Sequence, residues 1–144
     1  MLLTMKNNHY VLAIDFDGTL VKEHTFPEIG EPRIWLIDLL KGLRSQGHKL
    51  ILWTCREDVY EGDNTVFKPR LYLTEAVEWC YRYGLEFDAV NKNLSEVEDP
   101  TIKTCRKVFA DLYIDDKAAI FDDVSKTITF NEYINSINDL KRLI

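Results

Sequence analysis

The sequence predicts an α/β fold, in which helices cover both faces of a parallel sheet, as a single domain over residues 1–144. Short apolar segments alternate with segments in which apolar residues recur every three or four positions, the patterns of buried strands and amphipathic helices. The chain has the length of one ordinary domain and contains no repeat, low-complexity tract or linker. Alternation of this kind favours a parallel sheet, because right-handed crossovers return the chain in the same direction.

The first third of the chain predicts two strands and a helix. An unbroken apolar run predicts a strand over 9–15, and glycines and prolines predict a loop over 18–32. The helix is expected to begin near Glu31-Pro32, since proline is tolerated in a first turn, and to end at Gly47. Residues 48–54 form the second predicted strand. The buried face of the helix carries Leu36, Leu39, Leu40 and Leu43.

The rest of the chain continues the alternation less regularly. An acidic, turn-rich segment, 57–68, is expected to be a surface loop, and apolar spacing predicts a helix over 69–83. Short strands are expected over 87–91 and 112–114, joined by a polar segment with at most a short helix. Weaker patterns predict a strand over 127–130 and a terminal helix with Tyr133, Ile137, Leu140 and Ile144 on one face.

Composition narrows the function classes. The net charge is −6, from 18 basic and 24 acidic side chains, which argues against nucleic acid as a partner. Three widely spaced cysteines without a Cys-x-x-Cys pair argue against a disulfide framework or a zinc site. No apolar run approaches the roughly 20 residues that span a bilayer, so no membrane partner is expected. The N-terminus lacks a signal-peptide pattern, and a cytoplasmic location is expected.

Three predicted strands end in polar residues. Asp15 and Asp17 follow the first strand, Thr54 ends the second, and Asp115-Asp116 follow the strand over 112–114. The carboxyl ends of parallel strands share one edge of the sheet, where ligand sites form, so these side chains should converge. Paired carboxylates suit a nucleophile, an acid–base or ligands of a hard divalent cation, although turn residues and strand-end hydroxyls are the plain alternatives.

The motifs resemble those of the haloacid dehalogenase (HAD) superfamily, whose members are mostly phosphatases. The resemblance rests on Asp15-Phe16-Asp17-Gly18-Thr19-Leu20, on the strand ending in Thr54, on a lysine upstream of the last acids and on Tyr113-Ile114-Asp115-Asp116. It spans roughly residues 10–117. Small bacterial and phage HAD-like hydrolases carry similar Trp-Thr-Cys-Arg and Tyr-Ile-Asp-Asp-Lys segments, and the resemblance implies a Rossmann-like domain.

The resemblance implies specific catalytic and metal-binding roles. Asp15 would be the nucleophile that forms an aspartyl-phosphate, Asp17 the general acid and base, and Thr54 a phosphoryl ligand. Mg²⁺ would be held by Asp15, the Asp17 carbonyl and Asp116. Asp115 would orient a water molecule or the active-site lysine.

The motifs leave alternatives open for the active-site lysine and for the substrate-binding residues. Lys107 is the expected active-site lysine, and Lys103 and Lys92 are the alternatives. Arg56 is expected to bind substrate bidentately, against the alternative of a salt-bridged arginine. Further substrate-binding candidates are Gly18, Thr19 and Asn91, and Lys117 is another residue that would face the site.

The connections after Leu20 and Arg56 are too short for a separate cap domain. We therefore expect an open site that takes an exposed phosphoryl group on a larger substrate, or a phosphorylated small molecule enclosed by the 57–68 loop or by a neighbouring subunit of a homo-oligomer. The expected function is a Mg²⁺-dependent phosphomonoester hydrolase. The alternatives are a 5′-nucleotidase-like or phosphotransferase activity, or a non-catalytic phosphate- or phosphoprotein-binding module.

Overall fold

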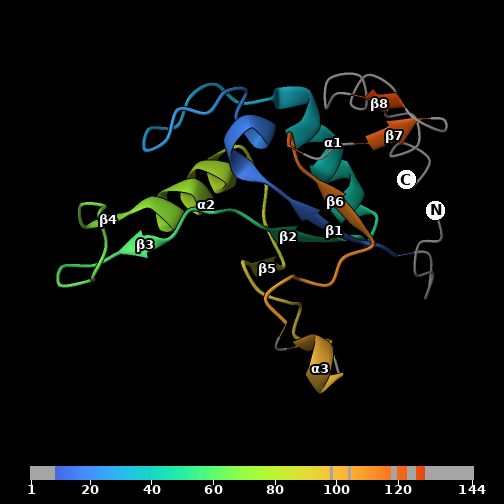
Figure 1. The fold of residues 1–144 in the computed structure, drawn as a ribbon. Helices are drawn as coiled ribbons and strands as arrows, with labels where there is room; N and C mark the ends of the chain where they lie inside the picture. The colour runs from blue at the N-terminus through green and yellow to red at the C-terminus, as the bar shows by residue number, and fades with distance from the viewer. Residues whose placement is uncertain (1–8, 98, 104, 118–119, 123–125, 129–144) are drawn as a thin grey trace.

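The computed structural model describes residues 9–97, 99–103, 105–117, 120–122 and 126–128 (Figure 1). Four parallel strands form the main sheet: β1 (Val11–Ile14), β2 (Lys49–Leu52), β5 (Ala89–Val90) and β6 (Leu112–Ile114), in the spatial order β5-β2-β1-β6. Ile14 pairs with Leu52 on one side and Ile114 on the other, so three strands end level with one another. The predicted α/β fold with a parallel sheet is confirmed.

The strand order changes direction after β5. From β1 the chain runs outward through α1 (Ile34–Ser45) to β2 and through α2 (Tyr72–Arg82) to β5, and it then crosses back to pair β6 with the other side of β1. Right-handed crossovers in opposite directions lie on opposite faces of a sheet. Both long helices therefore cover one face, and the return segment covers the other, as Figure 1 shows.

The expectation of helices on both faces needs a correction. The segment between β5 and β6 covers the second face mainly with irregular chain, and its helix, α3 (Pro100–Lys103), has four residues. Polar residues and Pro100 leave this segment without the apolar spacing that a longer helix needs.

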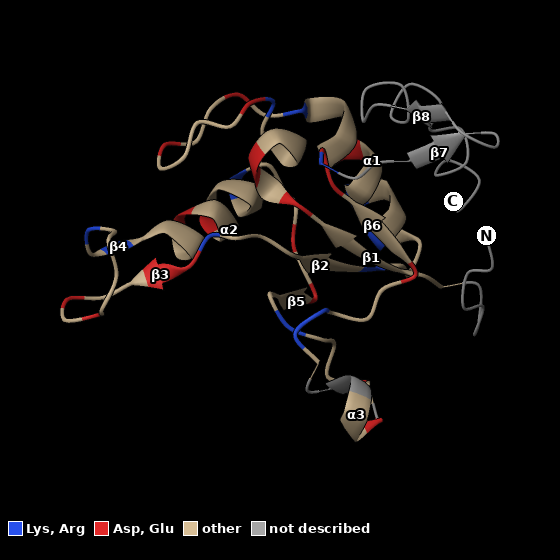
Figure 2. Ribbon diagram, in the orientation of Figure 1, with Lys and Arg blue, Asp and Glu red and all other residues tan. Residues whose placement is uncertain are grey.

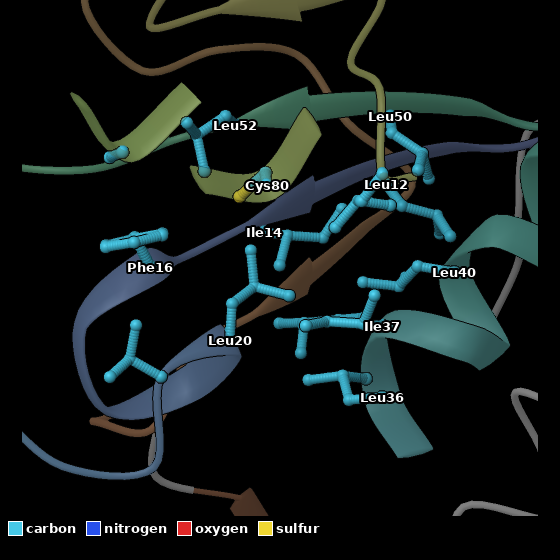
Figure 3. Close-up of a cluster of buried hydrophobic side chains, with 14 of the residues drawn as sticks. Leu12, Ile14, Phe16, Leu20, Leu36, Ile37, Leu40, Leu50, Leu52 and Cys80 are labelled. Atoms are coloured by element: carbon cyan, nitrogen blue, oxygen red, sulfur yellow. The ribbon is translucent and has the colours of Figure 1, made fainter. Parts of the chain in front are cut away.

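The main core lies between the sheet and the two long helices. Leu12, Ile14 and Leu52 pack against Leu40 of α1 and Cys80 of α2, all of them buried (Figure 3). The alternate strand residues face a smaller cluster on the other side, made by Ala13, Ile51, Ala89, Leu94 and Val108. Burial on both faces explains why the strands are apolar without alternation.

The segment after β2 contains structure that the sequence did not predict. Within 57–68, expected to be a loop throughout, β3 (Asp58–Val59) pairs antiparallel with β4 (Arg70–Leu71). Because β4 occupies the expected first turn of the second helix, α2 begins at Tyr72 rather than at residue 69. The Asp58 carboxylate then accepts hydrogen bonds from the first backbone N–H groups of α2, at Leu73 (3.0 Å) and Thr74 (2.9 Å). We call residues 58–71 the β3–β4 hairpin.

Near the C-terminus, β7 (Ile120–Asp122) pairs antiparallel with β8 (Lys126–Ile128), which agrees in part with the strand expected over 127–130. The expected terminal helix lies outside the described residues. Among the helices that the structure does describe, none combines the length and the apolar character needed to cross a membrane. Within the described part of the chain, neither the segment after η1 (Phe16–Leu20), the turn that follows β1, nor the one after β2 holds a separate cap domain.

Candidate active site

A cavity of about 740 Å³ opens at the carboxyl edge of the main sheet. Its lining includes Asp15 and Asp17 after β1, Thr54 after β2, and Asp115 and Asp116 after β6. Figure 2 shows the acidic residues gathered where β1 and β6 end. From β1 the chain continues to β2 on one side, whereas β6 is added on the other side of β1, and such a reversal of strand order is where ligands bind in open α/β sheets.

Three carboxylates at this edge form an acidic cluster. One oxygen each from Asp15, Asp115 and Asp116 lies within 4.8 Å of the others. Burial, and secondarily the negative charges of Asp115 and Asp116, raise the pKa of Asp15 from 3.8 to about 7. A nearby cation would relieve this repulsion.

The cluster fits a hard divalent cation such as Mg²⁺, which prefers oxygen ligands. Within the described part of the chain, the buried Oδ1 atom of Asp116 has no hydrogen-bond partner. A buried carboxylate oxygen without a hydrogen-bond donor destabilises the folded state, and a bound cation would remove this cost by coordinating the oxygen.

The turn after β1 brings the acids together. Gly18 has a φ of +82°, and a Cβ atom there would overlap the Asp116 carboxylate and the His24 ring. The buried Thr19 hydroxyl donates to Asp15 Oδ2 (3.2 Å) and accepts from the Asp116 N–H (3.1 Å). Gly18 and Thr19, expected to bind substrate, therefore lie behind the cluster and fix its geometry instead of lining the cavity.

Arg56 is almost completely buried, and its guanidinium is engaged within the protein. Its Nε and Nη2 atoms donate to the two carboxylate oxygens of Asp17, each at 2.9 Å, and Nη1 and Nη2 donate to the carbonyls of Pro27 and Glu28, each at 3.1 Å. Four of the five guanidinium N–H donors are thus used. The geometry matches the salt-bridged alternative and gives Arg56 the role of positioning Asp17.

Thr54 and Asn91 form a second braced turn. The Asn91 side chain accepts from the Thr54 N–H (2.8 Å) and donates to the Arg56 carbonyl (3.3 Å), while the Thr54 hydroxyl accepts from the Arg56 N–H (3.1 Å). Thr54 lines the cavity, and Asn91 supports it from behind. Asn91 adopts a φ of +52°, a conformation that asparagine tolerates better than most residues.

The structure separates the candidate lysines. The Lys107 ammonium lies 4.9 Å from the centre of the Tyr113 ring and does not line the cavity. Lys92 is exposed and also does not line it, and the Lys103 side chain lies outside what the structure describes. Lys117 does line the cavity, directly after the last two acids.

Some lining residues carried no usable signal in the sequence. His24 Nε2 lies 2.6 Å from Asp116 Oδ2, although the two residues are far apart in the chain. The rings of Phe26, Phe67 and Tyr72 form another part of the lining. In the sequence these residues are indistinguishable from ordinary core or loop residues, and only the fold places them beside the acids.

The fold and the edge site define an α/β protein with a ligand cavity at the point where the strand order changes. A search of solved structures finds similarity to one described as a conserved protein coded by a locus from Bacteroides thetaiotaomicron, with 37% sequence identity, coverage of 91% of each chain and a TM-score of 0.62. The chain belongs to the same family as that protein. No protein-family model and no curated protein matches the sequence.

Proposed function

We propose that this protein is a HAD-type phosphomonoester hydrolase that depends on Mg²⁺ and works through an aspartyl-phosphate at Asp15. The observation that carries the proposal is the acidic cluster at the carboxyl edge of β1 and β6, where carboxylate oxygens lie within 4.8 Å of one another. Asp17 and Thr54 line the same cavity, and so does Lys117, whereas the expected Lys107 does not.

The metal would be held by the carboxylates of Asp15 and Asp116 and by the backbone carbonyl of Asp17, with Asp115 beside them. When bound, Mg²⁺ supplies positive charge that offsets the phosphoryl oxygens and the acidic cluster. It would also favour the ionised form of Asp15, because its positive charge opposes the repulsion from the Asp115 and Asp116 carboxylates.

The reaction would proceed in two balanced steps. In the first, an Asp15 oxygen attacks phosphorus, the bond between phosphorus and the ester oxygen breaks, and Asp17 gives a proton to that oxygen, so that an alcohol leaves. In the second, Asp17 takes a proton from water, which attacks phosphorus and releases phosphate from Asp15. Thr54 would donate a hydrogen bond to a phosphoryl oxygen, and Lys117 would offset its charge.

The contact between Asp17 and Arg56 sets a condition on the first step. Both carboxylate oxygens of Asp17 accept hydrogen bonds from the guanidinium, so the proton for the leaving group would occupy the second lone pair of one of them. The hydrogen bonds to Arg56 would keep the carboxyl group beside the cavity.

The test is phosphate release from p-nitrophenyl phosphate with Mg²⁺. Asp15→Asn should abolish release, and the acid-quenched wild type should carry an acyl phosphate that hydroxylamine cleaves. Asp38→Asn, which changes an exposed carboxylate on α1, is the matched control and should react at the wild-type rate. Absence of turnover across a broad phosphoester panel would contradict the proposal and favour a non-catalytic phosphate-binding module.

The expected setting of this activity is the cytoplasm. Cys55, Cys80 and Cys105 carry free thiols in the structure, and reduced thiols are typical of proteins in a reducing compartment. The proposed substrate is a phosphorylated small molecule, because the cavity is bounded by the β3–β4 hairpin and the loop before α1.

A further inference from the structure

Three aromatic rings form one side of the cavity that contains the acidic cluster. Phe26 comes from the loop before α1, Phe67 from the β3–β4 hairpin and Tyr72 from the first turn of α2. The Phe26 ring centre lies 5.5 Å from that of Phe67 and 5.1 Å from that of Tyr72, and the last two are 6.2 Å apart. We call these three residues the aromatic wall.

The aromatic wall is held in place by contacts with its surroundings. Tyr72 is buried, and its hydroxyl donates to the Lys68 carbonyl at 3.0 Å. The Arg56 guanidinium lies 5.0 Å from the centre of the Phe26 ring. Arg70 ties the loop before α1 to α2, through ion pairs with Glu28 and Glu75. Rings that are fixed before a ligand arrives bind it with a smaller loss of conformational entropy.

Two of these rings still present apolar surface to solvent. Phe26 is 39% exposed and Phe67 is 50% exposed. A planar ring that stacked on them would remove apolar area from water and gain the additional attraction of an aromatic pair. An aliphatic group would lack the attraction of an aromatic pair, and a heavily hydroxylated group would find no hydrogen-bond partners on the ring carbons.

The charges in the cavity disfavour a substrate with several anionic groups. Beyond the acidic cluster, the lining contributes the carboxylates of Glu57, Asp58 and Asp63. The basic lining residues are Arg56, which is engaged with Asp17, His24, which contacts Asp116, and Lys117. A second phosphate or a carboxylate on the substrate would therefore meet negative charge instead of the arginine clusters that bind such groups.

We propose that the cavity takes phosphomonoesters with one phosphoryl group, whose leaving group carries a planar aromatic ring that stacks on the aromatic wall. This inference rests on the proposed phosphatase function. The cavity is of a size typical for small-molecule sites and suits a nucleoside 5′-monophosphate or an arylmethyl phosphate. In either case the phosphoryl group passes to Asp15 and the leaving oxygen takes the proton from Asp17.

Two matched substrate pairs test the proposal. Adenosine 5′-monophosphate and ribose 5-phosphate differ by the base. Benzyl phosphate and cyclohexylmethyl phosphate differ by aromaticity, and their alcohols are similar leaving groups. With Mg²⁺, kcat/KM should be about tenfold higher for the aromatic member of at least one pair. A higher kcat/KM for the aromatic member of the first pair alone would identify a nucleotide as the substrate class. A higher kcat/KM for the aromatic member of both pairs would show that any aromatic ring is accepted.

Variants connect this preference to the aromatic wall. Phe67→Ala should lower kcat/KM for the aromatic members by about tenfold, mainly through a higher KM, and leave ribose 5-phosphate unchanged. Tyr81→Ala removes a 65% exposed ring of α2 that does not line the cavity, and it should change nothing.

The failures of the two proposals are distinguishable. Equal kcat/KM within both pairs, or an equal loss in Phe67→Ala for every substrate, would overturn the aromatic preference and leave the phosphatase standing. Absence of Mg²⁺-dependent phosphate release from all four substrates and from the broad phosphoester panel, or undiminished release in Asp15→Asn, would overturn the phosphatase itself. Release from other phosphoesters but from none of these four would overturn only the aromatic preference.

Discussion

Asp15→Asn probes the electrostatics of the acidic cluster through the stability of the protein. The pKa of Asp15 rises from 3.8 to about 7 on folding, chiefly through burial and then through Asp115 and Asp116. Between about pH 4 and 7 the folded chain therefore binds more protons at this group than the unfolded chain does. The free energy of unfolding falls as pH rises through this interval. Below about pH 4, Asp15 is protonated in both the folded and the unfolded chain, so its burial no longer lowers the free energy of unfolding.

The size of the effect follows from the shift. At about 1.4 kcal/mol per pKa unit, the full shift corresponds to about 4 kcal/mol, and the partial exposure of Asp15 reduces the expected penalty to about 2 kcal/mol. Asparagine has nearly the same shape, and its carbonyl can accept the Thr19 hydrogen bond. In the absence of metal, Asp15→Asn should thus be about 2 kcal/mol more stable than wild type at pH 8 and equally stable at pH 4.

The assay is urea denaturation at pH 4, 6 and 8 in the presence of a chelator. Asp38→Asn is the control, because its carboxylate on α1 is 65% exposed, and it should show the wild-type pH dependence. Mg²⁺ should then stabilise the wild type at pH 8 more than Asp15→Asn, because the variant lacks one charged ligand. Parallel pH dependences of wild type and Asp15→Asn without metal would refute the reasoning.

Four further outcomes are expected. Arg56→Gln should lower the free energy of unfolding by about 3 to 5 kcal/mol, because it leaves Asp17 without its buried partner. In the same urea titration, the control Lys22→Gln breaks an exposed pair with Glu31 and should cost less than about 1 kcal/mol. Gly18→Ala should reduce phosphatase turnover and lower stability by at least about 1 kcal/mol, since the new methyl group overlaps Asp116 and the backbone is left-handed. Asp58→Asn should lower the melting temperature, because an amide caps the α2 N-terminus less well than a carboxylate does, at a cost of about 1 kcal/mol or less. Lys117→Ala should lower kcat at least about tenfold and Lys107→Ala should leave it near the wild-type value; the reverse order would restore Lys107 as the active-site lysine.

The convergence of the acids could be predicted because it depends on local patterns alone. The apolar runs that end at Ile14, Leu52 and Ile114 identify buried strands, and right-handed crossovers make such strands parallel. Once the strands are parallel, the polar residues that follow them must share an edge. The sequence therefore predicts which acidic side chains meet at this edge of the sheet.

The partners of these side chains could not be predicted, because they depend on distant packing. An arginine after a strand is exposed in most settings, and the burial of Arg56 requires Phe16 and Phe26, whose ring centres lie 5.1 and 5.0 Å from its guanidinium. The contact of His24 with Asp116 likewise depends on how the loop before α1 folds over the edge. The β3–β4 hairpin was missed because its two-residue strands are too short to show alternation.

The proposed acid and the aromatic wall are not independent parts of the site. The Arg56 guanidinium binds both oxygens of Asp17 and also lies against the Phe26 ring. Truncation of Phe26 would therefore disturb the residue that positions Asp17, so a loss of turnover would not separate substrate stacking from proton transfer. Phe67 belongs to the same wall but comes from the hairpin, and within the described part of the chain its ring contacts are with Phe26 and Tyr72. For this reason the aromatic preference is tested at Phe67, and Phe26 and Arg56 form the physical link between the aromatic wall and Asp17.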